Sequence, residues 1–340
     1  MAQRKKHFIF VDWMKVIGMY AIILGHFTPP ILKYLTYSFS VQLFFFISGF
    51  LFHVEKDSKV FWKKNIRLLV VPYFVWGIVR LTTYNIKEHN VQTLYHSFAG
   101  LMLGCNNFMG ARGCGELWFI VTLFYLKVFA QYVTLPLKSM IAFMAASLIF
   151  AAIYLHVICS TAFEFNGIGI FDSFVAFPFF VMGMAASKFR DKVFSLAERI
   201  KLHKIELLLS TVAIFVLLTF VSRTNGVVLM VYGQYGNNPL LYVLLGTFGI
   251  IGVFMFSILL SRFSNYSGCA KTINVGSVMI LGLHTLFVNK AKPVLESLGN
   301  NSFVYEISLV VVSIIILLLF IPLTTIVNKF MPISLGKRKF

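Results

Sequence analysis

Apolar segments long enough to cross a lipid bilayer dominate this sequence of 340 residues. A helix needs about 20 predominantly apolar residues to cross about 30 Å of hydrocarbon. Because a segment in lipid must satisfy its own backbone hydrogen bonds, the pattern predicts an all-α, polytopic membrane helix bundle with about ten transmembrane helices. The expected spans are residues 8–27, 35–52, 68–86, 117–135, 140–156, 171–187, 205–221, 240–260, 273–288 and 304–327.

The basic composition fits a membrane protein. The chain has 30 Lys and Arg against 12 Asp and Glu, a formal net charge of +18 that would indicate nucleic-acid binding in a soluble protein. With the N-terminus placed in the cytoplasm, 21 basic residues fall in inner loops, six in outer loops and three within spans. Positive charge collects on the cytoplasmic side of membrane proteins, so we expect cytoplasmic N- and C-termini and no nucleic-acid partner.

A single integral membrane domain is expected over residues 1–340, with a short basic cytoplasmic tail at 328–340. The basic, amphipathic loop at 188–204 is typical of a helix that lies on anionic lipid headgroups. In the outer stretch 223–239, Asn-Gly and Gly-Asn-Asn-Pro bracket a short β-like segment and favour a hairpin. Aromatic and amide side chains in that stretch suit either sugar recognition or an ordinary exposed loop: Tyr232, Gln234, Tyr235, Asn237 and Asn238.

The four cysteines show no metal-ligand spacing, so no metal site is expected. Cys105 and Cys114 share an outer loop. Either a disulfide between them or two small apolar thiols fits the sequence.

Three ionisable residues interrupt the first apolar segment: Asp12, Lys15 and His26. Ionisable groups in hydrocarbon cost about 3 kcal/mol each and usually mark function. At about 100° per residue, Lys15 and His26 share one helix face within about 20° and lie about 16 Å apart along the axis. Asp12 is three residues before Lys15, close enough to pair with it. The stripe indicates either a functional polar face or an interfacial ion pair with His26 as an end cap.

Other spans carry polar residues at defined places. Ser48 and Gly49 interrupt the aromatic second span, and Glu116 and Trp118 begin the fourth span. His284 lies in the middle of the ninth span. Three basic residues stand at the inner end of the third span, ahead of a proline: Lys63, Lys64, Arg67 and then Pro72.

In this order, these motifs resemble the membrane acyltransferase-3 family. The family's hallmark is an Arg or Lys followed after ten residues by His in the first span, which Lys15 and His26 match. Many members have Arg where this chain has Lys15, so the bidentate geometry toward phosphate is replaced by a point charge. The resemblance covers most of the chain and continues at residues 45–50, at Arg67 with Pro72, at 117–119, at Gly183 and in the ninth span with His284.

The resemblance implies a multi-pass O-acyltransferase of the bacterial cytoplasmic membrane. It would move an acyl group, most often acetyl, from cytoplasmic acetyl-CoA or another acyl-CoA to a hydroxyl of an extracytoplasmic saccharide or cell-envelope glycan. The compact branch of the family, which has no fused esterase domain, is the closest match. The expected partners are the acyl-CoA, the glycan acceptor and membrane lipid; the acceptor sugar, the acyl length and any covalent intermediate stay open.

The expected active site has a base at its outer end and cations at its inner end. A neutral imidazole, with a pKa of about 6.5, suits removal of a proton from a hydroxyl, so His26 is the expected catalytic base. Glu116 is expected beside it, to orient His26 or bind sugar hydroxyls, although a solvated loop acid fits as well. The acyl-CoA phosphates are expected to contact Lys15, Arg67, Lys63 and Lys64. Supporting roles in the site are expected for Asp12, Ser48, Trp118 and His284.

Some of these residues also have simpler interpretations. Lys63 and Lys64 equally fit charges that only set topology. Lys127 matches no motif, and snorkelling to the interface explains it. A polytopic transporter or flippase for an envelope glycan or lipid precursor is the main alternative function, because buried charges also build substrate and proton relays. A non-catalytic membrane sensor or scaffold is a third.

Overall fold

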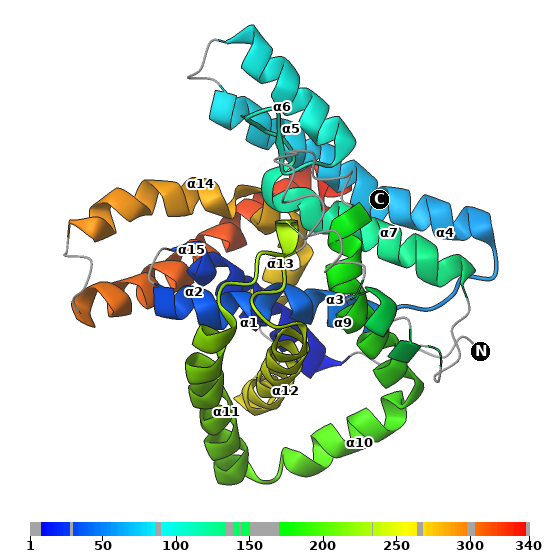
Figure 1. The fold of residues 1–340 in the computed structure, drawn as a ribbon, viewed down its shortest axis with the longest axis vertical. Helices are drawn as coiled ribbons and strands as arrows, with labels where there is room; N and C mark the ends of the chain where they lie inside the picture. Colours follow the sequence, from blue (N-terminus) through cyan, green and yellow to red (C-terminus); the bar gives the residue numbers. More distant parts are fainter. Residues whose placement is uncertain are drawn as a thin grey trace.

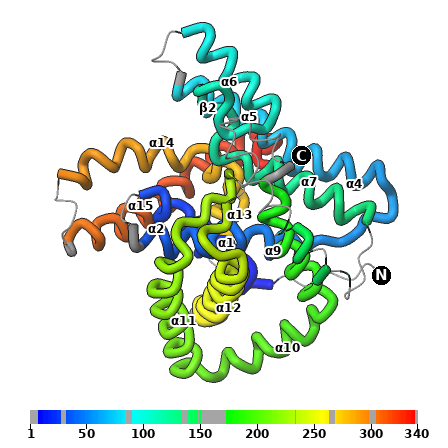
Figure 2. The backbone as a smooth tube through the Cα atoms, in the orientation of Figure 1, coloured from blue at the N-terminus to red at the C-terminus, as the bar shows by residue number. Residues whose placement is uncertain are grey.

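The computed structural model is a bundle of helices with α1 (Ile9–Gly25) and α3 (Ser40–Phe50) at its centre (Figure 1). Figure 2 follows the chain outward to α14 (Ser277–Glu296) with α15 (Phe303–Phe330) on one side, and to α11 (Lys204–Asn225) with α12 (Pro239–Phe263) on another. The structure describes residues 8–27, 30–85, 90–133, 170–232, 234–263, 268–297 and 303–337, together with parts of 139–149.

The remaining elements surround this centre. A π-helical turn at Ile66–Val70 joins α4 to α5, and α10 links α9 to α11. A two-stranded antiparallel hairpin follows α6, with short 3-10 turns after it at Gly115–Leu117, Met230–Tyr232 and Pro332–Leu335. The bounds are α2 Pro30–Tyr37, α4 Ser58–Asn65, α5 Val71–Asn85, α6 Val91–Leu103, β1 Asn107–Phe108, β2 Ala111–Arg112, α7 Trp118–Tyr132, α9 Ile170–Lys188, α10 Arg190–Ile200 and α13 Gly268–Val275.

The predicted helical, multi-pass architecture is confirmed. Within the described ranges, five helices are long and apolar enough to cross a membrane. Three statements stay predictions: that the chain crosses the membrane ten times, that residues 1–340 form a single domain with a tail at 328–340, and that both termini are cytoplasmic. The predicted span 140–156 lies largely outside the described residues. The five helices are Ser58–Tyr84, Lys204–Tyr232, Pro239–Arg262, Ser277–Glu296 and Val304–Phe330.

Two predicted spans are interrupted. The second breaks between α2 and α3, where Phe39 leaves the helical region with φ −143° and ψ −22°. Its ring lies against Gly249 of α12, where a Cβ would collide with it. The ninth breaks at Gly276, where a Cβ would collide with the side chain of Thr324 on α15. In both places a close contact with another helix, which hydropathy does not register, sets the break.

The predicted hairpin at 223–239 is wrong for the described part of that stretch, which contains a 3-10 turn at Met230–Tyr232. The residues that signal a turn instead contact Asn225 and close the loop around it. The Asn225 side chain donates to the carbonyl of Tyr235 at 3.0 Å. The hairpin lies instead in the loop after α6, where Asn107 pairs with Arg112. Just beyond it, the amide of Cys114 donates to the carbonyl of Cys105 at 2.7 Å. These two cysteines form no disulfide in the structure.

Close packing of α3 against α9 brings two helix backbones together. A Cβ on Gly183 would collide with the carbonyl oxygen of Phe46, and one on Gly49 would collide with that of Phe180. Small residues permit this approach in membrane bundles, where dispersion contacts between helices replace much of the hydrophobic driving force. The α3 residues between these two contacts, Ile47 and Ser48, line the site described below.

Gly183→Ala is therefore expected to lower the stability of the folded protein by about 1–3 kcal/mol, because backbone cannot move aside as a flexible side chain can. Thermal unfolding of the purified protein in detergent measures the effect. Gly268→Ala is the matched control, since a Cβ there meets no atom within 4 Å. Equal unfolding temperatures for the two variants would contradict the packing described here.

Candidate functional site

A cavity of about 620 Å³ passes through the centre of the bundle, between α1, α3 and α7. One end is lined by Lys15, Lys64 and Lys127, and we call it the lysine end. The other is lined by His26 and Glu116, and we call it the histidine end. Exposed side chains line both ends of the cavity, among them His53 and Tyr232. Its middle is mostly apolar, with Met19, Ile22, Val41, Phe44, Ile47, Ile120 and Leu123 in the wall.

The helical face predicted for the first span is confirmed. Lys15, Met19, Ile22 and His26 all line the cavity, at the four- and three-residue spacings of one helix face. The rise of a helix places Lys15 about 16 Å from His26 along α1. Ser48 on α3 and Trp118 at the start of α7 also line the cavity. The structure therefore brings six of the predicted side chains into the cavity wall: Lys15, His26, Ser48, Lys64, Glu116 and Trp118.

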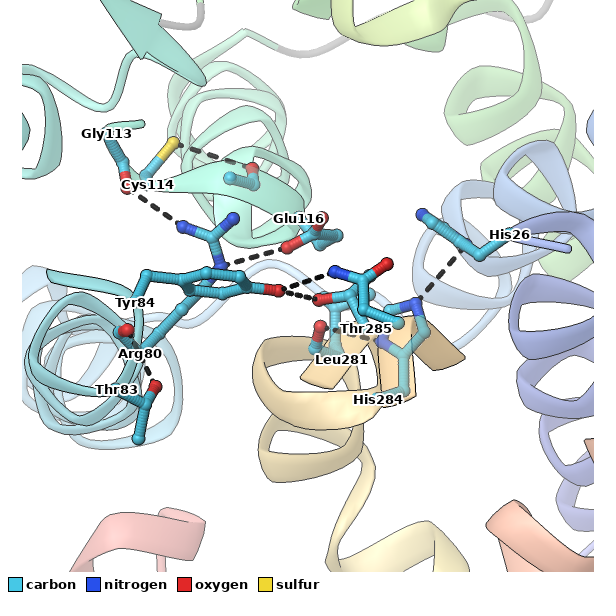
Figure 3. A network of polar contacts seen from close by, with 12 residues as sticks. His26, Arg80, Thr83, Tyr84, Gly113, Cys114, Glu116, Leu281, His284 and Thr285 are labelled. Atoms are coloured by element: carbon cyan, nitrogen blue, oxygen red, sulfur yellow. Dashed lines mark hydrogen bonds and ion pairs between the residues drawn. The ribbon is translucent and has the colours of Figure 1, made fainter. Parts of the chain in front are cut away.

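Two histidines meet at the histidine end (Figure 3). The ring of His284 is fully buried behind His26 at a centroid distance of 4.6 Å and an interplanar angle of 82°. His284 Nδ1 lies 2.9 Å from the carbonyl of Ile280, and its Nε2 lies 3.3 Å from Nδ1 of His26. A carbonyl only accepts, so Nδ1 of a neutral His284 carries the proton and Nε2 is left as an acceptor.

The same rule assigns the tautomer of His26. Its Nδ1 lies 2.8 Å from the carbonyl of Ile22 and so donates, with His284 Nε2 as the second acceptor. This leaves Nε2 of His26 with a lone pair on the side away from His284 (Figure 3). Among the residues the structure describes, that atom has no hydrogen-bond partner. A neutral imidazole arranged in this way can take a proton from a group in the cavity.

Glu116 is held by a residue that sequence reasoning left in the third span without a role. Arg80 Nε donates to Glu116 Oε2 at 3.0 Å, and Arg80 Nη1 donates to the carbonyl of Gly113 at 3.1 Å (Figure 3). Arg80 is only 3% exposed, whereas the Glu116 side chain is 22% exposed and lines the cavity. Arg80 therefore fixes the carboxylate at the histidine end. An arginine in an apolar span was itself the available signal, because a buried charge requires a partner.

The backbone around Glu116 is shaped for this arginine. Gly115 has φ +53°, a conformation that favours glycine, and a Cβ there would collide with the Arg80 guanidinium. Tyr84 lies against the same guanidinium at 4.9 Å, and Arg112 lies over the Tyr84 ring at 4.8 Å. The Tyr84 hydroxyl donates to Thr285 at 3.1 Å, which ties α5 to α14 beside His284. Each contact limits the orientations open to the arginine.

The lysine end contains two paired cations. Lys15 lies 4.0 Å from Asp12, which also accepts a hydrogen bond from Asn274 at 3.2 Å. Lys64 lies 2.5 Å from Glu55. His53 contacts the same carboxylate at 3.0 Å, and Gln131 holds the Glu55 backbone through both its amide atoms.

Not every predicted residue faces the cavity. Neither Arg67 nor Lys63 lines it, and Lys63 is exposed. The cavity face of this segment is formed by Phe61, Lys64, Asn65, Leu68 and Leu69, and both Lys63 and Arg67 lie off that face. His284 lies behind His26 and not in the cavity wall, and Asp12 contacts two residues that line the cavity, Lys15 and Asn274. Lys127, expected to snorkel, lines the lysine end.

The loop between α11 and α12 contributes one of its candidate sugar-binding residues to the cavity. Tyr232 lies in the wall with Met230 and Asn106, and Asn107 donates to the Tyr232 hydroxyl at 3.4 Å. Tyr235 is buried against Tyr242. The backbone amides of Asn237 and Asn238 donate to Asn225, at 2.7 and 2.9 Å, and close the loop. These two residues therefore stabilise the loop that carries Tyr232.

The comparisons with known proteins give one match. A family model described as an acyltransferase domain, that of the acyltransferase-3 family, matches residues 8–327. Neither the comparison with curated proteins nor that with solved structures gives a match.

Arg80→Met is expected to destabilise the protein by about 3 kcal/mol, because it leaves the Glu116 carboxylate without its buried partner. Thermal unfolding measures this loss, and the double variant Arg80→Met/Glu116→Gln should recover much of it by removing the charge as well. Arg112→Met is the matched control, since Arg112 contacts the same tyrosine ring but is exposed. If Arg80→Met unfolds at the temperature of the control, the ion pair does not organise this end of the cavity.

Proposed function

The chain belongs to the acyltransferase-3 family and is a membrane acyltransferase, and from this premise we propose its donor and acceptor. The donor is a cytoplasmic acyl-CoA, with acetyl as the group transferred. The acceptor is a hydroxyl of a saccharide or cell-envelope glycan outside the cytoplasmic membrane of a bacterium. The lysine end of the cavity faces the cytoplasm and the histidine end faces the acceptor.

The observation that carries this proposal is the single cavity with lysines at one end and His26 at the other. The pantetheine arm of an acyl-CoA contains about as many chain bonds as four residues of polypeptide, so its extended length is about 15 Å. That length matches the axial separation of about 16 Å between Lys15 and His26. Phosphates held by the lysines would therefore place the thioester beside His26, with the arm along the apolar middle of the cavity.

The chemistry follows from the tautomer of His26. The acceptor hydroxyl donates its proton to Nε2 as its oxygen attacks the thioester carbonyl carbon. The new C–O bond forms, the C–S bond breaks, and the departing thiolate takes the proton back from the imidazolium. During this step His26 carries a positive charge, which Glu116 at the same end stabilises electrostatically. Arg80 and His284 act as positioning residues for these two groups.

The acceptor would enter beside Tyr232, whose exposed ring and neighbouring Asn106 line the outer mouth. An aromatic face with amide groups nearby suits the apolar face and hydroxyls of a sugar. The mouth also contains Met230, so the acceptor meets both apolar and polar surface before its hydroxyl reaches His26.

Membership in an acyltransferase family favours transfer of a group over transport of a whole glycan. In addition, apolar side chains on three helices line the middle of the cavity, and such a surface suits a pantetheine arm better than a polar glycan.

The test uses a bacterium that makes the acylated glycan and expresses this chain as the enzyme. His26→Ala and Lys15→Ala are each expected to lower transfer, and loss of the catalytic base alone should cost about 10²–10⁴-fold. Mass spectrometry of the surface glycans measures the acetyl ester, and the amount of glycan is measured beside it. Lys59→Ala, an exposed lysine of α4 outside the cavity, should leave the ester unchanged.

Loss of the ester with a normal amount of glycan is the expected result. Loss of the glycan itself would indicate transport or flipping. An unchanged ester in both variants would indicate a sensor or scaffold and would remove His26 from the proposed mechanism.

A further inference from the structure

Lys127 occupies a place in the cavity that no sequence motif assigns. It lies nine residues after Trp118 on α7, so the helix rise puts it about 14 Å from the histidine end. Lys15 lies at a similar depth on α1, about 16 Å from His26. The charges of Lys64 and Lys15 both act on Lys127, so the three lysines surround one region of the cavity.

Two of the three lysines in this region have an acidic partner among the described residues, and the third does not. Lys15 faces Asp12 at 4.0 Å and Lys64 faces Glu55 at 2.5 Å. Lys127 has no ion-pair or hydrogen-bond partner among the described residues. Its neighbours along α7 in the cavity wall are apolar, with Leu123 one turn away. A cation beside two like charges and apolar surface is unfavourable unless an anion enters.

We propose that Lys127 completes a three-lysine site for the pyrophosphate of an acyl-CoA. The inference rests on the proposed function and adds to it the residue that supplies the uncompensated charge. Lysine is a point charge with three donors and binds phosphate oxygens without a fixed fork geometry, so three lysines on α1, α4 and α7 can share one pyrophosphate.

The distance between Lys127 and the histidine end favours the pyrophosphate over the 3′-phosphate of the nucleotide as the group bound by the three lysines. From the pyrophosphate, an extended pantetheine arm of about 15 Å reaches the histidine end. The 3′-phosphate sits on the far side of the ribose from that arm. If it occupied the three-lysine site, the thioester would lie well beyond His26.

The experiment measures the Kd of purified protein in lipid nanodiscs for three donors: acetyl-CoA, 3′-dephospho-acetyl-CoA and acetyl-pantetheine, which has no phosphate. Lys127→Met should weaken binding of the first two by about tenfold or more, since a hydrogen bond to a charged group is lost, and leave the third unchanged. Lys127→Arg, which keeps the charge, should lose less. Lys59→Met is the matched control, an exposed lysine on α4.

Unchanged binding of acetyl-CoA by Lys127→Met, with the wild type binding it, would overturn this inference and leave the proposed function standing. A loss for acetyl-CoA but not for the dephospho form would overturn the assignment to the pyrophosphate. An equal loss for acetyl-pantetheine would mean that Lys127 supports the cavity and not the phosphates. Absence of acyl-CoA binding by the wild type would overturn the proposed donor together with this inference. Should Lys127→Met unfold, Lys127→Gln takes its place.

Discussion

The cost of placing charge inside an apolar bundle constrains the rest of this structure. The protein compensates its buried charges in two ways. Arg80 and Glu116 form an ion pair that glycine and tyrosine contacts hold in place. Lys127 instead faces a cavity, where an anionic ligand can neutralise it. The two ends of the cavity therefore differ in chemistry, with Lys15, Lys64 and Lys127 at one end and His26 and Glu116 at the other.

Hydropathy predicted the helical, membrane-spanning character well, because the length of an apolar segment is a property of the sequence alone. The breaks at Phe39 and Gly276 could not be predicted in this way. Each is set by a contact with a distant helix, Gly249 on α12 and Thr324 on α15. The hairpin was placed in the wrong outer loop for a related reason: Asn-Gly and Asn-Asn-Pro signals mark a turn, but only the fold shows that Asn225 uses them to close a loop.

The candidate site was predictable where helical periodicity decides the geometry. Lys15 and His26 share a face because eleven residues make just over three turns. Arg80 and Lys127 were missed, although the argument from the cost of buried charge applied to both, because their surroundings come from other segments: Glu116 is 36 residues from Arg80. The sequence alone could not show which of Lys63, Lys64 and Arg67 meets the cavity. The structure shows which face of that helix meets the cavity, and this face contains Lys64.

The account depends on one molecule of donor reaching from the lysines to His26. A structure of the protein with an unreactive thioether analogue of acetyl-CoA tests it most directly. We expect the pyrophosphate among Lys15, Lys64 and Lys127, the pantetheine arm along the apolar wall, and the acyl carbonyl carbon about 3–4 Å from where an acceptor oxygen bonded to His26 Nε2 would lie. An analogue bound outside the cavity, or one whose acyl group ends far from His26, would contradict the mechanism.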